Sequence, residues 1–256
     1  RSSVQRHVLS QTQANAGFDR ITASTADLSL NDREIIIEAA TEDLELKKKI
    51  FSQLSEVASP DTILATNTSA LPIHQLAAHI SHPERLVGIH FFNPVPRMKL
   101  VEVVKAPQTS DATLAAAVRF VQSIGKLPVV VNDSPGFVVN RILLPYLVRA
   151  GQLFSDGHAP ETIDNCMLDF GMPMGPLRLL DEVGLDVSLH VAKTLSAAFP
   201  TRMEIPSILT DLVAKGLLGK KSSEGFYLYD KGNTKPNPNI QPGTSPKSSA
   251  QKIQDE

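Results

Sequence analysis

Two side chains with acid–base chemistry lie in neighbouring apolar segments, twelve residues apart. His90 lies near the end of the run LVGIHFF, and Glu102 lies within LVEVV. A carboxylate buried in such a strand costs several kcal/mol unless it is paired or hydrogen-bonded. His90 alone would more often be a core histidine, but it is an available partner for Glu102 across a turn that contains two prolines. A glutamate that holds one imidazole nitrogen leaves the other to accept a proton, which suits proton removal from an alcohol.

Four more polar side chains stand where strands pass into helices. Ser69 in ATNTSAL is a candidate helix N-cap and a candidate hydroxyl aimed at a substrate oxygen, and both roles could hold within this one segment. Asn140 in DSPGFVVNR lies in a predicted helix, where asparagine is mildly unfavourable, so its amide either faces solvent or has a function. Glu42 and Lys47 follow another predicted strand and are equally consistent with exposed charges at a helix end.

The elements that would position these side chains alternate between strands and helices as far as residue 133. β-Branched apolar runs predict the strands, and apolar residues at helical spacing predict the helices. The expected strands are 34–40, 62–66, 86–92, 100–105 and 128–131, and the expected helices are 43–57, 71–80 and 112–124. This alternation predicts a mainly parallel sheet covered by helices, with His90 at the end of a strand, where open α/β sheets bind ligands.

The pattern changes after residue 133, because helical periodicity continues and strand signals almost vanish. The expected helices are 137–154, 159–170, 175–198 (broken early) and 206–215. The sequence therefore predicts an α/β domain over residues 1–133 and an all-helical domain over residues 134–229. Residues 230–256 are rich in Pro, Asn, Ser, Lys and Gln and lack apolar periodicity, so they are expected to form a disordered tail.

Composition excludes several classes of protein. The chain has 256 residues and a formal net charge of -2, and no basic stretch is interleaved with aromatic residues, so nucleic acid is not an expected partner. No apolar run approaches the roughly 18 residues that a membrane span requires. The one cysteine, Cys166, cannot form an internal disulfide, and no metal-ligand cluster surrounds it, so a reducing, intracellular compartment is expected.

The first 17 residues contain no acidic side chain and begin with Arg1 instead of methionine. The sequence is therefore processed, cloned or incomplete. The composition of this segment is compatible with a mitochondrial transit peptide. We favour a polar surface helix, since Val4 and Val8 are one helical turn apart.

Six blocks of the sequence together resemble the L-3-hydroxyacyl-CoA dehydrogenase family over roughly residues 19–229. They are IIIEAATEDLELKKKIF, ATNTSALPI, GIHFFNPVPRMKLVEVV, VVVNDSPGFVVNRILLPYL, FGMPMGPLRLLDEVGLDV and GLLGKKSSEGFYLY. The combination of HFFNPVP, LVEVV and DSPGFVVNR is the most specific part. The resemblance implies a truncated Rossmann-type domain followed by a helical domain, and oxidation of (S)-3-hydroxyacyl-CoA to 3-oxoacyl-CoA with NAD in fatty-acid β-oxidation.

The resemblance also implies roles for individual residues. His90 would be the general base, Glu102 would orient it, and Ser69 and Asn140 would hydrogen-bond the substrate oxygen. The residues expected along the NAD cofactor are Glu42, Lys47, Ser69, Asn93 and Lys221. The helical domain would supply most of a homodimer contact and one wall of the acyl-CoA cleft.

The resemblance is compatible with two kinds of parent protein, a multifunctional enzyme and a stand-alone enzyme. FGMPMGPLRLLDEVGLDV and the KGNTKPNPN extension also resemble the dehydrogenase part of multifunctional fatty-acid oxidation enzymes, at even weight with a stand-alone enzyme. The compartment would be the cytoplasm of a bacterium, or the mitochondrion or peroxisome of a eukaryote. The alternatives are a non-catalytic acyl-CoA-binding or structural relative, and an NADP-using 3-hydroxybutyryl-CoA dehydrogenase. The joint presence of Ser69, His90, Glu102 and Asn140 argues for an enzyme.

The sequence departs from the family pattern at its beginning. None of the 14 glycines forms the G-x-G-x-x-G turn that holds the pyrophosphate of a dinucleotide, and the acidic residue that would bind the ribose is also absent. The chain is therefore expected to start within or just before the helix that follows this turn. Without the central strand and the phosphate site, we expect weak NAD binding and an exposed apolar sheet edge.

Overall fold

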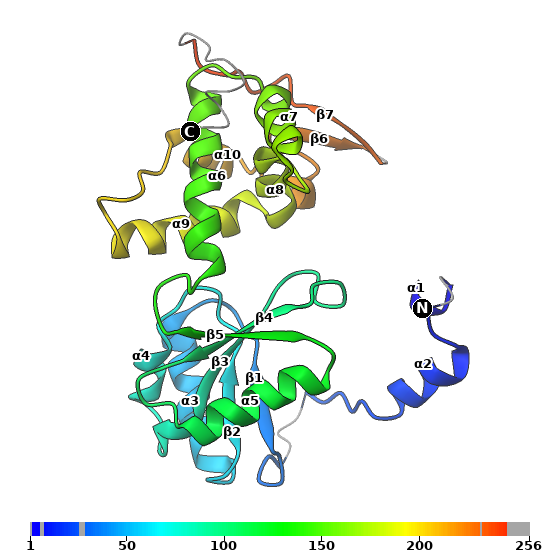
Figure 1. Ribbon diagram of the computed structural model, residues 1–256, viewed down its shortest axis with the longest axis vertical. Helices are drawn as coiled ribbons and strands as arrows, with labels where there is room; N and C mark the ends of the chain where they lie inside the picture. The colour runs from blue at the N-terminus through cyan, green and yellow to red at the C-terminus, as the bar shows by residue number, and fades with distance from the viewer. Residues whose placement is uncertain (1, 6–7, 26–28, 231, 245–256) are drawn as a thin grey trace.

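The computed structural model describes residues 2–5, 8–25, 29–230 and 232–244. These residues form an α/β half and a helical half, with the helical half stacked on one end of the sheet (Figure 1). An N-terminal arm, made of α1 (Ser2–Gln5) and α2 (Gln11–Phe18), projects from the α/β half. No residue of α2 is buried, so the expected polar surface helix is present as two short helices. Residues 1, 6 and 7 of that expected helix lie outside the described residues.

Five strands form one sheet in the order in which they follow one another along the chain. They are β1 (Ile35–Glu38), β2 (Ile63–Thr66), β3 (Leu86–Phe91), β4 (Leu100–Lys105) and β5 (Leu127–Asn132). β1, β2 and β3 are parallel, β3 and β4 are antiparallel, and β4 and β5 are parallel. The predicted mainly parallel sheet is confirmed. The antiparallel pair arises because residues 92–99 connect β3 to β4 as a hairpin, without the crossover that a parallel pair needs.

Alternate residues of the strands pack into two hydrophobic cores, one on each face of the sheet. The core that contains Phe51 packs against α3 (Leu44–Val57) and α4 (Ile73–Ala77), and the core that contains Val121 packs against α5 (Asp111–Ser123). Leu64 faces the first core and Ala65 the second, as the two-residue period of a strand requires. Pro83–Arg85 form the short 3₁₀ helix η1, which leads into β3.

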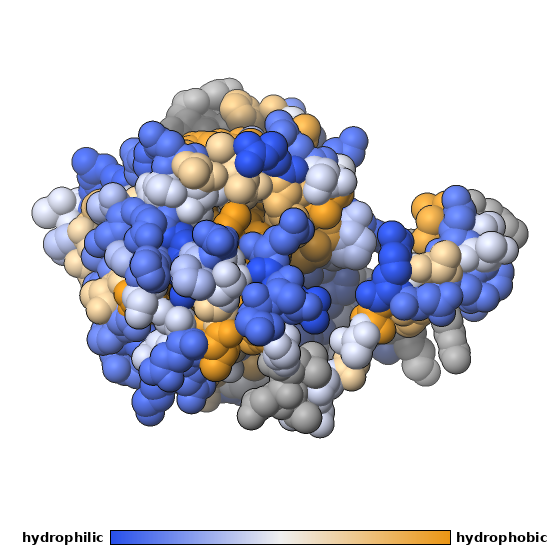
Figure 2. Space-filling model, turned by 90° about the horizontal axis from the view of Figure 1, so that it is seen from below, coloured by the Kyte–Doolittle hydropathy of each residue, from blue (hydrophilic) through white to orange (hydrophobic). Residues whose placement is uncertain are grey.

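β1 forms one edge of the sheet, as expected. Its Ile35, Ile36 and Ile37 are half-buried, because Ile36 packs against the core beside α3 and the other two against the core beside α5. Figure 2, which views the chain from the α/β end, shows apolar residues there in small patches between hydrophilic ones.

Within the described residues, no helix is both long and apolar enough to cross a membrane.

Five helices enclose the second half around a separate apolar core. They are α6 (Val139–Ser155), α7 (Pro160–Phe170), α8 (Pro176–Val183), α9 (Leu185–Ala198) and α10 (Ser207–Ala214). The long helix expected over residues 175–198 is broken at Gly184, which separates α8 from α9. Gly184 has a φ of 101°, a value that residues with a Cβ rarely adopt.

The chain beyond residue 226 corrects two expectations, an all-helical domain as far as residue 229 and a disordered tail from residue 230. After the 3₁₀ helix η2 (Lys220–Ser222), β6 (Tyr227–Asp230) and β7 (Asn233–Pro236) form an antiparallel hairpin. The Asn237 amide then donates to the carbonyl of Gly225 at 2.9 Å, and Ile240 is buried. Polar side chains fix this segment by local hydrogen bonds, so apolar periodicity gave no signal. Residues 231 and 245–256 lie outside the described residues.

Candidate active site

His90 and Glu102 are direct partners in the antiparallel register of β3 and β4. Because directly opposed residues share a face of the sheet, both side chains lie on the face covered by α3 and α4. The His90 Nδ1 and a Glu102 carboxylate oxygen are 2.9 Å apart. Their side chains are 5% and 1% exposed. The pairing predicted from sequence is therefore present, and it is buried.

The second carboxylate oxygen of Glu102 binds the start of the helical half. It accepts hydrogen bonds of 2.9 Å from the backbone amides of both Val138 and Val139, at the N-terminus of α6. Burial by itself would raise the pKa of Glu102, but the hydrogen bonds from His90, Val139 and Val138 outweigh burial and hold the pKa below its usual value. Glu102 is thus a carboxylate that joins β4, His90 and α6.

Two aromatic rings lie beside the His90 imidazole. The Phe92 ring lies with its centroid 4.5 Å from that of His90, and the Phe137 centroid lies at 5.8 Å. Phe137 has a φ of 49°, and the preceding Gly136 has a φ of 70°, so the chain turns sharply between β5 and α6. This turn places the ring of Phe137 beside His90 and the next two amides on Glu102.

Asp133 fixes the start of the segment that links β5 in the α/β half to α6 in the helical half. Its carboxylate accepts hydrogen bonds from the amides of Ile73 at 3.0 Å and His74 at 2.8 Å, where α4 begins. The ring Nδ1 of His74 lies 2.7 Å from the same carboxylate. Asp133 therefore anchors the segment that leads into the turn at Phe137.

Ser69 and Asn140 come together from the two halves of the chain. The Asn140 side-chain amide donates to the Ser69 carbonyl oxygen at 3.0 Å. Ser69 does not cap α4, because Pro72 occupies the N-cap position. Among the described residues, no hydrogen bond involves the Ser69 hydroxyl, so that group is available to a ligand. The N-cap alternative for Ser69 is thereby wrong.

Glu42 and Lys47 are placed differently from the exposed helix-end charges that the sequence also allowed. The Lys47 side chain is 1% exposed, and its ammonium forms a 2.6 Å ion pair with Glu38. Glu42 is half-buried, and one of its oxygens accepts a 2.9 Å hydrogen bond from the Ser69 amide. These two residues are therefore part of the framework that carries Ser69.

The two remaining predicted cofactor residues lie apart from this framework. Asn93 is exposed in the loop between β3 and β4. Lys221 lies in η2 of the helical half, where its ammonium pairs with Asp186 of α9. No hydrogen bond or ion pair within the described part of the chain joins Asn93 or Lys221 to the other predicted site residues.

Two residues that the sequence interpretation missed also position the site. Glu38 ends β1 and pairs with Lys47, and it carries the same signal as Glu102, an acidic residue within an otherwise apolar strand. Asn67 accepts a 2.9 Å hydrogen bond from the Phe91 amide, which holds the ends of β2 and β3 together. Asn67 stands in the same motif as Ser69, but its role depends on the pairing of two strands that spacing alone does not reveal.

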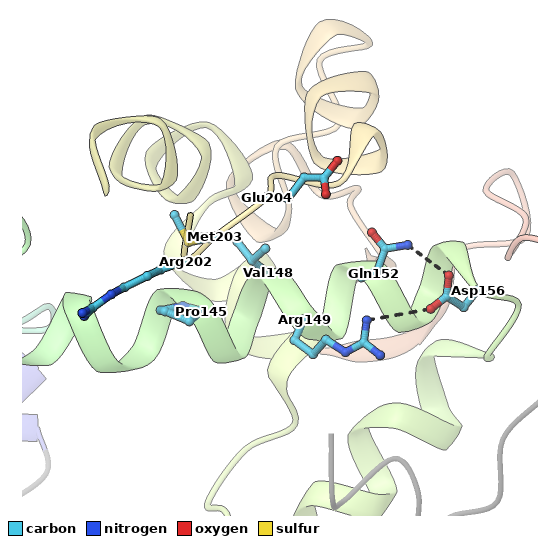
Figure 3. A pocket seen from close by; sticks show the side chains of 8 residues that line it. All are labelled: Pro145, Val148, Arg149, Gln152, Asp156, Arg202, Met203 and Glu204. Carbon is cyan, nitrogen blue, oxygen red and sulfur yellow. Dashed lines mark hydrogen bonds and ion pairs between the residues drawn. The ribbon is translucent and has the colours of Figure 1, made fainter. Parts of the chain in front are cut away.

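A cavity of about 650 Å³ lies away from these residues, in the helical half. Figure 3 shows that α6 forms one wall, with Pro145, Val148, Arg149 and Gln152, and that Arg202, Met203 and Glu204 lie opposite. None of the predicted catalytic residues lines it. Within the described residues, no group of three His, Cys, Asp or Glu side chains is arranged to hold a metal ion.

Comparison with known proteins identifies the family. The model of the 3-hydroxyacyl-CoA dehydrogenase NAD-binding domain matches residues 1–134, and that of the 3-hydroxyacyl-CoA dehydrogenase C-terminal domain matches residues 136–229. This chain belongs to the 3-hydroxyacyl-CoA dehydrogenase family. A similar relative is the fatty acid oxidation complex subunit alpha of Vibrio cholerae, 41% identical over 231 residues, which are 90% of this chain and 32% of the relative. The chain thus spans about a third of the length of the curated relatives it matches.

Solved structures agree with this assignment. FadB2 of M. tuberculosis is 39% identical, with a TM-score of 0.87 over 90% of this chain and 82% of that one. The 3-hydroxybutyryl-CoA dehydrogenase of Escherichia coli K12 is 41% identical, with a TM-score of 0.84 over 89% of this chain and 49% of that one. The α/β half followed by helices is therefore the fold of this family.

Proposed function

We propose that this protein oxidises (S)-3-hydroxyacyl-CoA to 3-oxoacyl-CoA with NAD+, as a step of fatty-acid oxidation. The observation that carries the proposal is the buried His90–Glu102 pair, because a carboxylate bound to Nδ1 leaves Nε2 of the imidazole to exchange a proton. Nothing nucleophilic is bonded to His90 in the described part of the chain. This arrangement supports proton transfer over acyl transfer.

The proton has a defined route in this proposal. His90 Nε2 takes the proton of the 3-hydroxyl group while C3 of the substrate loses a hydride, and the C–O bond becomes a carbonyl. The imidazolium that forms is stabilised by the Glu102 carboxylate, whose lowered pKa keeps it ionised. Phe92 and Phe137 limit the access of water to the ring, which strengthens the ion pair when it forms.

The substrate oxygen would be held by Ser69 and Asn140. The Ser69 hydroxyl has no partner among the described residues, and the Asn140 amide is already directed at the Ser69 segment. The two side chains come from different halves of the chain, so substrate would be bound between the halves. Oxygen-directed donors of this kind favour the developing alkoxide over the neutral alcohol.

The residues present fit the nicotinamide end of the cofactor. Glu42 and Ser69 follow the carboxyl ends of β1 and β2, the position at which open α/β sheets bind dinucleotides, and Asn93 follows β3. NAD+, when bound, supplies the hydride acceptor. The resemblance adds Lys221 from the helical half. No glycine-rich pyrophosphate turn occurs within these 256 residues, so the nicotinamide end is the part that this chain accounts for.

The test is the reduction of acetoacetyl-CoA by NADH, measured on the complete gene product by the loss of NADH absorbance. Replacing His90 by Gln should lower kcat by about 10² to 10⁴-fold, because a positioned general acid–base contributes that much. His79→Gln, an exposed histidine of the same half, is the matched control and should leave kcat unchanged. Activity that survives His90→Gln contradicts the proposed base. An inactive wild type that still binds CoA esters supports the binding-protein alternative.

The substrate and the assembly are parts of the proposal that further assays resolve. Two structural neighbours bear the name 3-hydroxybutyryl-CoA dehydrogenase, so a short acyl chain is the first substrate to try. Comparing NADH with NADPH in the same assay decides the cofactor. Because a relative is a subunit of a fatty acid oxidation complex, we propose that the protein acts inside the cell as part of such an assembly or as a homodimer. Light scattering of the complete gene product distinguishes the two.

A further inference from the structure

We infer that Arg141 is a positioning residue for the His90–Glu102 pair, because its guanidinium holds the turn that leads from β5 into α6. This turn comprises residues 134–137 and is called the 134–137 turn below. Arg141 acts through the turn, which in turn fixes the groups that face Glu102. The inference rests on the proposed function for its effect on catalysis, and on geometry alone for its effect on the turn.

Two neighbours fix the Arg141 guanidinium. Its Nη1 donates a 3.0 Å hydrogen bond to the Ser134 hydroxyl. Its central carbon lies 4.3 Å from the centroid of the Phe199 ring, directly after α9. Arg141 is half-buried, and within the described residues it forms no ion pair. A planar guanidinium can stack on a ring and donate from its edge at the same time, whereas a lysine ammonium is a compact point charge without that plane.

Two backbone hydrogen bonds shape the 134–137 turn. The Phe137 amide donates to the Ser134 carbonyl oxygen at 2.8 Å. The Arg141 amide donates to the Gly136 carbonyl oxygen at 3.2 Å, so Arg141 binds the turn with both its backbone and its side chain. Phe137 has a φ of 49°, a left-handed conformation that a residue with a Cβ keeps only where its surroundings hold it. The turn therefore depends on contacts from outside itself.

The helix α9 and the residue that follows it supply those contacts. Gly136 packs so closely on Leu195 of α9 that a Cβ would lie 2.7 Å from a methyl carbon of that leucine. Leu195 is buried and lies four residues before Phe199. The Arg141 guanidinium joins Ser134 to the Phe199 ring beside this contact. The turn is thus attached to the end of α9 at two points, and Arg141 supplies the polar one.

The two amides that follow the turn connect it to the acid–base pair. Those of Val138 and Val139 each donate a 2.9 Å hydrogen bond to Oε1 of Glu102. The Oε2 of Glu102 is the oxygen that lies 2.9 Å from His90. One carboxylate therefore binds the end of the turn with one oxygen and the base with the other. A turn that loses Arg141 should loosen Glu102, and with it the orientation of the imidazole.

Acetoacetyl-CoA reduction by the complete gene product tests the effect on catalysis. In Arg141→Met we expect kcat to fall by about tenfold to 100-fold, since a small misplacement of catalytic groups has effects of that size. The KM for acetoacetyl-CoA should change by less than about twofold, because the turn orients the base. Arg202→Met is the matched control, since Arg202 lies 5.9 Å from the same Phe199 ring but, among the described residues, donates no hydrogen bond to the turn. A rise in KM with kcat unchanged, or no change in either, would overturn the inference.

A double-mutant cycle tests whether Arg141 acts through Ser134. Ser134→Ala removes the hydroxyl that accepts the guanidinium bond and keeps the backbone of the turn. It should lower kcat by a smaller factor than Arg141→Met, because the contact of Arg141 with Phe199 remains. The double variant should lose no more kcat than Arg141→Met alone, since residues that act as a unit are not additive. Losses that multiply would overturn the inference, because Arg141 would then act by another route.

The pH dependence of kcat separates positioning from a general loss of stability. Burial raises the pKa of Glu102, and the hydrogen bonds from His90, Val139 and Val138 lower it. In Arg141→Met the weakened amide bonds should let the pKa of Glu102 rise. The pH below which kcat is lost should therefore be higher in this variant than in the wild type and in the control variant. A fall in kcat without that displacement would contradict the link between the turn and Glu102.

Hydrogen exchange of the complete gene product tests the geometry without any need for activity. In Arg141→Met the amides of Val138 and Val139 should exchange faster by about tenfold or more, while the amides of β4 keep their protection. Unchanged exchange at these two amides overturns the inference. Where Arg141→Met does not fold, Ser134→Ala gives the same test with a smaller expected change. If the wild type does not reduce acetoacetyl-CoA, the proposed function fails, and exchange alone decides whether Arg141 holds the turn.

Discussion

Glu102 in the α/β half and Asp181 in the helical half are equally buried, with 1% of each residue exposed, but their pKa values shift in opposite directions. The pKa of Glu102 lies below its usual value. The pKa of Asp181 rises from 3.8 to about 6. Burial disfavours the charged form of both. The difference must therefore come from the groups that each carboxylate faces.

The partners explain the difference. Glu102 faces an imidazole that can become a cation, and two amides at a helix N-terminus. Among the described residues, Asp181 accepts hydrogen bonds only from neutral groups, the amides of Phe226 and Tyr227 and the hydroxyl of Tyr229. A second buried carboxylate, Asp164, also raises its pKa by repulsion. Although the two carboxylates are equally buried, Glu102 stays ionised beside His90, whereas Asp181 takes up a proton at a higher pH than an ordinary aspartate does.

The two arrangements suit different tasks. Asp164 and Asp181, with Tyr227 and Tyr229, form a structural unit that we call the acidic latch, because it joins α7 and α8 to β6. Gly225 packs against the Asp181 carboxylate so closely that a Cβ would overlap it. The latch holds the helical half together, whereas Glu102 holds a base. Substitutions in the acidic latch should therefore lower the free energy of unfolding, whereas substitutions of Glu102 should lower kcat.

The largest effect is expected for Glu102→Gln. The glutamine carbonyl can still accept the Val138 and Val139 amides, so the fold should survive. Its NH₂ group would face His90 Nδ1 and move the imidazole proton to Nε2, which removes the base. We expect kcat for acetoacetyl-CoA reduction to fall by about 10² to 10⁴-fold.

Glu84→Gln is the matched control for that substitution. Glu84 forms another His–Glu pair, with His82 at 3.2 Å, and both side chains of this pair are 54% exposed. Because water surrounds this pair, its loss should leave kcat unchanged. Equal losses of activity in the two variants would show that Glu102 has no special role beside His90.

The second largest effect is expected for Asp181→Ala. Three donors, on Phe226, Tyr227 and Tyr229, would lose their acceptor, so the free energy of unfolding should fall by about 3 kcal/mol. Urea denaturation followed by circular dichroism measures the free energy of unfolding. Under conditions in which Asp181→Ala is folded, its kcat should stay close to that of the wild type. Asp169→Ala, an exposed aspartate of α7, is the control. A large loss of kcat in folded Asp181→Ala would contradict the division between the two halves.

The third prediction concerns pH. Burial, the largest cause, raises the pKa of folded Asp181, so the folded state binds the proton more tightly than the unfolded state. This contribution to stability is complete below the unfolded pKa of 3.8 and is lost as pH rises through about 6. The shift corresponds to about 3 kcal/mol.

Glu102 should act in the opposite direction, because its lowered pKa gives stability above its unfolded value that is lost as pH falls. Urea denaturation at a series of pH values, compared between wild type and Asp181→Asn, isolates the latch. The difference between the two free energies of unfolding should change across the window from about pH 4 to about pH 6. A difference that is constant with pH would contradict the raised pKa of Asp181.

The sequence predicted the α/β half in more detail than the helical half, and the reason is physical. An acidic residue in an apolar strand stands out, so Glu102 was recognised, and Glu38 carries the same signal although it was missed. Asp164 and Asp181 lie in amphipathic helices, where a charge normally marks the solvent face and gives no sign of burial. The hairpin of β6 and β7 was missed because polar residues such as Asn237 fix it.

The smallest effect is expected for Tyr229→Phe, which removes one donor from Asp181 and leaves the ring under the Arg178 guanidinium. One lost hydrogen bond should lower the free energy of unfolding by about 1 kcal/mol. The bond from Tyr229 also lowers the pKa of Asp181, so its removal should move the pH midpoint of stability above that of wild type. Tyr227→Phe, which removes one donor from Asp164 instead, is the matched variant. If the midpoint stays in place, neutral donors do not oppose burial here, and the contrast with Glu102 must rest on the imidazole alone.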